Sequence, residues 1–543
     1  MPQHPNVLLI MTDQERYPPP YETPEIAAFR RSHLPGRERL RARSVEFHRH
    51  YCAATACSPS RTSLFTGHYQ SLHGVSTTDG LAKPVHDPSM TWLDPDTVPT
   101  MGDLFRAAGY RTFYKGKWHL SRADLLEPGT HVALMANDDK GGVIDVVVER
   151  YRRADRLDRF GFSEWIGREP HGPARADTGS VRDDLIGDQV CDLFARLAAA
   201  PDESPWLAVA SLVNPHDIAF SGFGRDVLAL PAPDDTVPEI PAAPSQGDSL
   251  DGRPACQAAF RDLWPQLLYP QPADGEYRRF YFWLHKLVDR IIERIVDALD
   301  TSAFAEDTII VLTSDHGEML GAHGGQQQKW HNAYDETIRI PLLVSGPGVD
   351  AGADRVDIPT SHIDLLPTLL GLAAIDAEAA SERVSEHHVE TQPPVGRDLS
   401  ALLRGETNAA ALAAPVYFMT EDQISRGLRS VNRFTGEPFV PVPAPANVES
   451  VVASLGHGNA AHLWKLNHYY ERLPEWEAAH GLRAPANHDV APDEWELHDL
   501  TADPEERHDR AVESPAELAQ MQRVLDAERD AKLRLPSARN ARS

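Results

Sequence analysis

Cysteine is scarce in this chain of 543 residues. The four cysteines are spread along the sequence as Cys52, Cys57, Cys191 and Cys256. They are too few and too scattered for a disulfide scaffold, and no pair has the C-x-x-C spacing of a zinc site. We therefore expect a reduced, cytoplasmic protein.

Long apolar runs are also missing. No stretch approaches the roughly 18 uninterrupted apolar residues that a membrane span requires. The chain runs from Met1 directly into the apolar segment 6–11, without the basic and apolar regions of a secretory signal peptide. These features predict a soluble protein with no membrane partner.

Basic side chains are in deficit. Lysine and arginine number 53 against 80 aspartates and glutamates, which gives a formal net charge of −27. The averaged field repels polyanions, so nucleic acid and anionic membrane surfaces are not expected partners. An anionic substrate would need a local basic pocket.

Four apolar runs have the composition of buried strands. They span residues 6–11, 206–213, 308–313 and 340–344. The first ends at Asp13 and Gln14, the second leads to His216, and the third leads to Asp315 and His316. Functional groups gather at the carboxyl ends of parallel strands, so we expect all four runs in one mostly parallel sheet with these side chains at its edge.

Helices are expected between the strands. The clearest covers residues 277–299, where apolar residues recur at spacings of three and four with charged residues opposite. Shorter helices are expected at 99–109 and 363–372, and one with Ser58 and Pro59 in its first turn. The alternation predicts an α/β fold, with a large mostly parallel sheet flanked by helices.

Composition divides the chain into two parts. We expect a catalytic domain over 1–403, with surface insertions at about 228–254 and 374–394 that are rich in proline or acidic residues. Beyond residue 403 the sequence becomes rich in proline and aromatic residues. We assign 404–543 to a smaller C-terminal α+β subdomain and tail.

Three strings carry a resemblance to a known family. They are Cys57-Ser-Pro-Ser-Arg61, the run Gly109-Tyr-Arg-Thr-Phe-Tyr-Lys-Gly-Lys-Trp-His119, and Trp495-Glu-Leu-His-Asp-Leu-Thr-Ala-Asp-Pro-Glu-Glu506. The first two resemble the signatures of the type I sulfatases, and the third is similar to a phrase near the C-terminus of these proteins. The resemblance implies an alkaline-phosphatase-like fold and hydrolysis of sulfate monoesters.

The resemblance also implies a modified nucleophile. In this family the cysteine of C-x-P-S-R is oxidised to formylglycine (3-oxoalanine) by a formylglycine-generating enzyme. The aldehyde hydrates to a gem-diol, and one hydroxyl attacks sulfur while the other later expels the sulfate. Cys57 is the corresponding residue here, so it is expected to be a nucleophile precursor.

The other site residues follow by the same resemblance. Arg61 would hold the formylglycine oxygen, Lys117 would face the sulfate, and His119 would contact the diol as a base. His216 and Lys329 would serve the leaving oxygen, and Lys115 is expected to be solvated. The implied ligands of one divalent metal ion are Asp13, Gln14, Cys57, Asp315 and His316.

The ligand set differs from that of many sulfatases. Asp13-Gln14 and Asp315-His316 stand where a calcium shell has paired carboxylates and Asp-Asn, so an anionic ligand is lost and an imidazole is gained. This favours Mn²⁺ over Ca²⁺. The pattern looks like the branch of choline sulfatases, phosphonate monoester hydrolases and their arylsulfatase relatives.

Several alternatives stay open at this point. Phosphonate monoesters and phosphodiesters carry the same single negative charge as a sulfate monoester, and the same cations would serve them. Choline sulfate would need an aromatic cage. A two-metal phosphatase, a binding protein that has lost catalysis and a homo-oligomeric assembly are further alternatives. The preferred function is an arylsulfatase-like sulfuric ester hydrolase.

Overall fold

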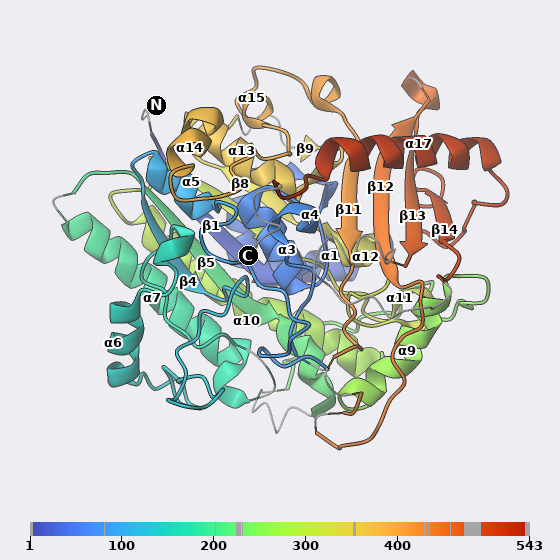
Figure 1. Cartoon of the computed structure of the whole chain (residues 1–543), viewed down its shortest axis with the longest axis horizontal. Helices are drawn as coiled ribbons and strands as arrows, with labels where there is room; N and C mark the ends of the chain where they lie inside the picture. Colours follow the sequence, from blue (N-terminus) through green and yellow to red (C-terminus); the bar gives the residue numbers. More distant parts are fainter. Residues whose placement is uncertain are drawn as a thin grey trace.

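A central seven-stranded sheet organises the protein (Figure 1). The computed structural model describes the chain except for residues 1–3, 81, 171, 173, 201, 224–229, 231, 351–354, 428–429, 433, 457, 472–489 and 538–543. The strand order is β4-β5-β1-β6-β8-β2-β9. The strands span β4 Arg111–Gly116, β5 Trp206–Pro215, β1 Asn6–Asp13, β6 Thr308–Ser314, β8 Leu342–Ser345, β2 Val45–Phe47 and β9 Arg355–Val356.

The first four strands of this order are parallel; β5, β1 and β6 were predicted from the sequence, whereas β4 was not. β1 lies between β5 and β6, with Val7 opposite Leu207 on one side and Ile309 on the other. Their carboxyl ends therefore meet at one edge of the sheet. The α/β fold class, with its mostly parallel sheet, is confirmed.

The fourth apolar run joins the central sheet only from Leu342 onward, as β8, and not as a parallel strand. Ile340 lies in β7 (Arg339–Ile340) of a separate three-stranded sheet, and β8 runs antiparallel to β6. The reason is that the chain does not cross over after β6. Gly317 N–H donates to the Thr337 carbonyl, so the connection returns to the same edge, from which β8 can only run back.

Alternating residues of β1 bury two different cores. Val7, Leu9 and Met11 pack on the face covered by α3 (Cys57–Thr66), α5 (Met101–Ala107) and α13 (His362–Leu372). Leu8 and Ile10 pack on the face covered by α7 (Gly179–Ala199) and α10 (Gly275–Asp300). Both faces are apolar because a parallel sheet is covered on both sides.

The C-terminal part forms a second, antiparallel sheet. Its strands, in the order β11-β12-β13-β14, are Val416–Thr420, Asn447–Leu455, His462–Tyr470 and Glu494–Asp499. Helix α17 (Pro515–Lys532) lies across these strands (Figure 1) and packs Met521 and Leu525 against them. The predicted smaller α+β unit is therefore present.

The two expected insertions are not purely surface features. In the first, where residues 228–229 and 231 lie outside the described part, Val237 and Ile240 pack against α10. In the second, helix α14 (Ala377–Val384) buries Ala380 and Val384 in the main core.

Within the described ranges, we find no helix with the length and apolar character needed to cross a membrane.

A buried ion network ties the end of β1 to two helices. Arg37, in α2 (Pro35–Arg41), pairs with Glu15 at 2.5 Å and with Asp289 of α10 at 2.8 Å. Burial disfavours ionisation of Glu15, but the Arg37 guanidinium outweighs it and lowers the pKa of Glu15 to about 2. This pair stabilises the fold above the ordinary carboxyl pKa and is lost as the pH falls toward 2.

Replacing Glu15 by glutamine is therefore expected to lower the free energy of unfolding by about 3–5 kcal/mol at pH 7, because Arg37 loses a buried partner. The difference from the wild type should shrink as the pH falls from about 4.5 to 2. Urea unfolding across this pH range measures it. Asp297→Asn breaks a half-exposed pair with Arg39 and should cost less than about 1 kcal/mol. An equal loss in both variants would contradict the prediction.

Candidate active site

The carboxyl ends of four adjacent parallel strands supply most of the site. Asp13 ends β1, and Asp315 and His316 follow β6. Lys117 follows β4, and His216 follows β5. Sequence analysis predicted this convergence for Asp13, Asp315 and His316 from the strand ends alone.

Cys57 comes from a different element and is brought to the same edge. It is the first residue of α3, all ten residues of which are buried. Ser58 and Pro59 lie in the first turn, as expected, where the missing N–H of proline leaves no intrahelical bond unmade. The amino end of this helix therefore points its unpaired N–H groups toward the sheet edge.

Four side chains form a compact cluster of potential metal ligands. One ligand atom from each of Asp13, Cys57, Asp315 and His316 lies within 4.8 Å of the others, and all four residues are buried. His316 Nε2 is 3.2 Å from Cys57 Sγ and 3.7 Å from Asp315 Oδ1. Metal bonds of about 2.0–2.6 Å place neighbouring ligand atoms about 3–5 Å apart, so this set fits a single divalent ion.

Two cations lie beside the carboxylates. Arg61 donates from Nη2 to Asp13 at 2.7 Å and from Nε to Asp315 at 2.9 Å. Lys117 Nζ is 2.7 Å from Asp13 Oδ2 and 3.7 Å from Cys57 Sγ. Burial disfavours the charged form of Asp13, but nearby cations, first among them Lys117, hold its pKa well below its usual range. The site thus keeps an anionic ligand at neutral pH.

The His316 imidazole and the Cys57 thiol are both neutral at physiological pH. Burial lowers the pKa of His316 to about 4, which leaves a ring nitrogen lone pair for a metal. Burial, reinforced by the negative charge of Asp13, raises the pKa of the Cys57 thiol to about 12. An unmodified Cys57 is therefore a poor nucleophile, because the thiolate is the reactive form.

Three predicted residues remain, which are His216, His119 and Lys329. Burial and the charge of Lys117 lower the pKa of His216 well below its usual range. His119 Nε2 lies 2.6 Å from Asp79 Oδ1, and its backbone N–H donates to Glu169 at 2.8 Å. Lys329 Nζ donates to Gln14 Oε1 at 2.7 Å.

The Gln14 amide, predicted as a metal ligand, bonds Lys329, Glu318 and Gln328. The backbone N–H of Gln14 donates to Asp315 at 3.0 Å. Lys115 is buried and pairs with Glu164 at 2.9 Å, so the expectation that it is solvated was wrong. Side chains alternate along β4, which turns Lys115 toward a covered face.

The residues that hold the site side chains were not predicted from the sequence. Ser211 accepts from Arg61 at 2.8 Å, and Glu169 accepts from the backbone of Trp118 and His119. They stand far from the motifs in the chain, so no local signal marks them. Glu318, within the Asp315-His-Gly-Glu string, is the one whose position could have been noticed.

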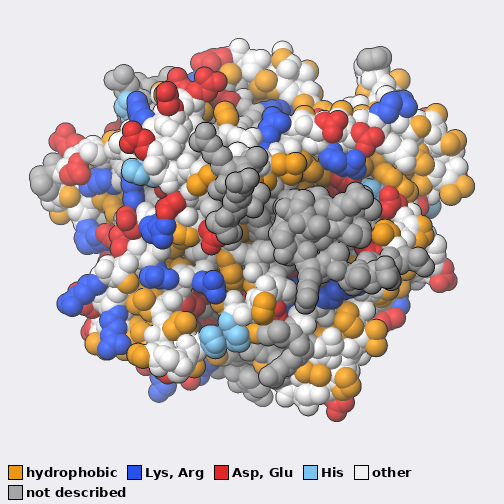
Figure 2. All heavy atoms as spheres, in the orientation of Figure 1, with side chains coloured by type: hydrophobic (Ala, Val, Ile, Leu, Met, Phe, Trp, Pro, Cys, Tyr) orange, Lys and Arg blue, Asp and Glu red, His pale blue; other side chains and the backbone are white. Residues whose placement is uncertain are grey.

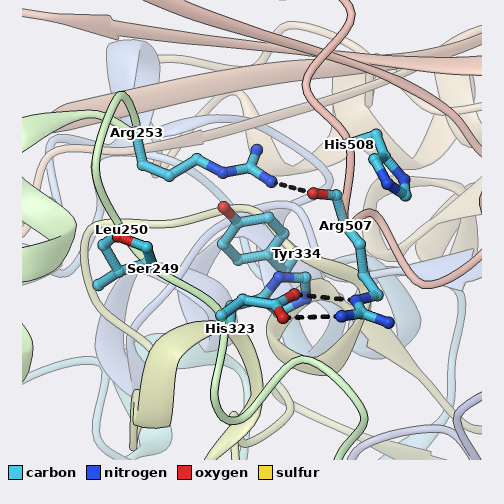
Figure 3. Close-up of a pocket in the computed structure, with 8 residues that line it drawn as sticks. Ser249, Leu250, Arg253, His323, Tyr334, Arg507 and His508 are labelled. Atoms are coloured by element: carbon cyan, nitrogen blue, oxygen red, sulfur yellow. Dashed lines mark hydrogen bonds and ion pairs between the residues drawn. The ribbon is translucent and has the colours of Figure 1, made fainter.

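A cavity of about 260 Å³ lies away from this cluster (Figure 3). Arg507 closes one side by pairing with Asp248, and His323 stacks on Tyr334 behind them (Figure 3). The lining contains none of the predicted site residues.

On the face shown in Figure 2, acidic and basic side chains are intermixed. The cations of the candidate site are buried instead.

Comparison with known proteins agrees with this architecture, whose sheet and C-terminal subdomain define an alkaline-phosphatase-like fold. The model of the Sulfatase family matches residues 5–375. The chain therefore belongs to the sulfatase family, whose members are hydrolases that act on sulfate esters.

Individual relatives support the same family. The uncharacterized sulfatase YidJ of Escherichia coli strain K12 is 30% identical over 380 residues, covering 69% of each chain. The choline-sulfatase of Rhizobium meliloti strain 1021 is 28% identical over 392 residues, covering 69% of this chain and 68% of its own.

Solved structures share the fold over nearly the whole chain. The phosphonate monoester hydrolase of Agrobacterium radiobacter has a TM-score of 0.58 and 19% identity, covering 97% of this chain and 96% of its own. The protein BT4656, solved in complex with its substrate D-glucosamine-2-N,6-O-disulfate, has a TM-score of 0.60 and 17% identity, covering 97% of this chain and 98% of its own.

The state of the thiols gives a test of the site in its unmodified form. Cys57 is buried with a raised pKa, whereas Cys191 is partly exposed. In native protein made without a formylglycine-generating enzyme, iodoacetamide at pH 8 is expected to label Cys191 and to leave Cys57 largely unlabelled. Peptide mass spectrometry measures this, and labelling of all four cysteines in urea is the control. Fast native labelling of Cys57 would show a thiolate.

Proposed function

We propose that this protein is a formylglycine-dependent, metal-assisted hydrolase of sulfate monoesters. The observation that carries the proposal is the position of Cys57. Its sulfur lies at the amino end of a buried helix, 3.2 Å from His316 and 3.7 Å from the Lys117 ammonium. A nucleophile at this point would have both a metal and a cation beside it.

Conversion of Cys57 would remove the difficulty that its thiol presents. A thiol whose pKa burial raises to about 12 is neutral at pH 7. The hydrated aldehyde of formylglycine supplies one hydroxyl for attack and a second for release of the sulfate, which a thiol does not offer. The proposal therefore requires a formylglycine-generating enzyme during maturation.

One divalent ion would be held by Asp13, Asp315 and His316 together with residue 57. It would supply a positive charge that favours deprotonation of the attacking hydroxyl and neutralises the sulfate oxygens. The mixed carboxylate and imidazole donors favour Mn²⁺, although Ca²⁺ remains the alternative that the family resemblance offers. Arg61, which donates to both Asp13 and Asp315, would orient their carboxylates toward the ion.

The surrounding side chains have distinct proposed roles. Lys117 and Lys329 would bind the non-bridging and leaving oxygens of the ester as cations. His216 is held neutral, because burial and Lys117 lower its pKa, so it would donate a hydrogen bond to the leaving oxygen. His119 would act as the base for sulfate release, with Asp79 at 2.6 Å orienting its ring.

Relatives support sulfate esters ahead of other substrates. The curated relatives include a choline-sulfatase and a sulfatase at about 30% identity. A phosphonate monoester hydrolase shares the fold, and a phosphonate monoester carries the same single charge. Promiscuous hydrolysis of phosphonate monoesters is therefore part of the proposal.

The nucleophile is tested by mass spectrometry combined with hydrolysis of p-nitrophenyl sulfate and a p-nitrophenyl phosphonate. After co-expression with a formylglycine-generating enzyme, the peptide containing position 57 is expected to be about 18 Da lighter than the cysteine form. Cys57→Ala is expected to lose at least about 10³-fold in kcat/KM, because no nucleophile remains.

Cys191→Ser is the matched control, because this cysteine lies outside the cluster and should keep wild-type activity. The ratio of the hydrolysis rates of p-nitrophenyl sulfate and the p-nitrophenyl phosphonate shows which class of ester the protein prefers. Full activity with an unmodified thiol at position 57 would overturn the proposal and would require a different nucleophile.

The metal is tested by elemental analysis of purified protein. About one divalent ion per chain is expected, and His316→Ala should lower the metal content because it removes one of four clustered ligands. His362→Asn is the control, because this histidine is buried and bonds Ser60 and the Ser314 carbonyl outside the cluster. Equal metal content in all three proteins would argue against this site.

A further inference from the structure

Glu318 is a buried carboxylate to which the site described above gives no role. It follows Asp315 by three residues, and its side chain is fully buried. Its Oε1 accepts hydrogen bonds from the Tyr277 hydroxyl at 3.1 Å and from the backbone N–H groups of Leu320 and Gln328 at 3.0 and 2.9 Å. Its Oε2 accepts one from Gln14 Nε2 at 2.5 Å. The two oxygens therefore serve different parts of the structure.

This arrangement fixes the orientation of the Gln14 amide. A carboxylate has only acceptors, so Gln14 must turn its NH₂ group toward Glu318. The same NH₂ group donates to Gln328 Oε1 at 3.1 Å. The amide oxygen of Gln14 is then directed at Lys329, whose Nζ donates to it at 2.7 Å.

Lys329 lies close to the reacting end of the site. It is joined to the ligand cluster through Gln14, whose side chain accepts from Lys329 Nζ at 2.7 Å and whose backbone N–H donates to Asp315 at 3.0 Å. Its Nζ also lies 4.7 Å from the centre of the Trp330 ring, which fixes the ammonium from a second side. Among the described residues, Gln14 supplies the side-chain oxygen that accepts a hydrogen bond from this lysine.

We propose that Glu318 is a positioning residue for Lys329: through the Gln14 amide it holds the lysine ammonium where it meets the leaving-group oxygen. The role of the lysine rests on the proposed function. The positioning is a property of the hydrogen bonds and stands apart from it.

The isosteric variant Glu318→Gln makes the idea testable. Two backbone N–H groups face Oε1 and cannot turn away, so the new amide must keep its oxygen there and present its NH₂ group to Gln14. Gln14 must then reverse its own amide to accept this bond. Its NH₂ group would face the Lys329 ammonium, donor against donor, and the lysine would move.

Kinetics with aryl sulfates of different leaving-group pKa measure the consequence. Glu318→Gln is expected to lower kcat/KM by about 10- to 100-fold, most for the poorest leaving groups, as Lys329→Ala should. In the Lys329→Ala background the same change should cost less than about 3-fold, because the two residues act as one unit. Wild-type activity in Glu318→Gln, or a full loss in both backgrounds, would overturn the proposal.

Two further variants separate positioning from simple damage to the fold. Tyr277→Phe removes a donor to Oε1 only, so Gln14 should keep its orientation and activity should stay within about 3-fold of the wild type. Glu318→Gln combined with Gln14→Glu restores an acceptor that faces Lys329 and should recover part of the lost activity. A double variant no better than Glu318→Gln would contradict transmission through residue 14.

Crystal structures of the wild type and Glu318→Gln give a readout that needs no activity. Lys329 Nζ is expected within hydrogen-bond distance of Gln14 in the wild type and displaced from it in the variant. If the contact persists in both, the positioning is wrong. If the wild type hydrolyses no ester, the proposed function fails, while these structures still decide the positioning.

Discussion

The site depends on one guanidinium that is buried between two carboxylates. Arg61 reaches Asp13 at the end of β1 and Asp315 after β6, and none of the three side chains is exposed. Removing one member of such a group would leave an uncompensated charge in a medium of low dielectric constant. The requirement for Arg61 therefore ties helix α3, and Cys57 at its amino end, to the middle of the central sheet.

The same constraint reconciles the charge of the chain with an anionic substrate. The net charge of −27 disfavours polyanions at long range, yet the site gathers Arg61, Lys117 and Lys329 within the protein. Because these cations are buried, their fields are little screened by salt and act over a few ångströms. A small ester that enters the site meets positive charge that an extended polyanion at the surface does not.

Much of the fold and site was predictable because the informative signals are local. Apolar runs ending in Asp13 and Asp315 indicated parallel strands and their functional edge, and Ser58 and Pro59 indicated the helix that begins at Cys57. The direction of β8 was not predictable, because it depends on where the chain returns after residue 337, and that is set by tertiary hydrogen bonds. The burial of Lys115 likewise depends on Glu164, which lies 49 residues away in the chain.

Gln14 shows how a single change in residue type alters the charge balance of such a site. A carboxylate at this position would pair with the Lys329 ammonium and cancel its charge. A neutral amide accepts the same hydrogen bond without cancelling it, so the lysine keeps its attraction for an anion. The amide has a cost, because it can turn either way and needs a neighbour with acceptors only. Glu318 meets that need. The Gln14 side chain lies between Glu318 and Lys329, so the negative charge of Glu318 is further from the lysine than a carboxylate at position 14 would be.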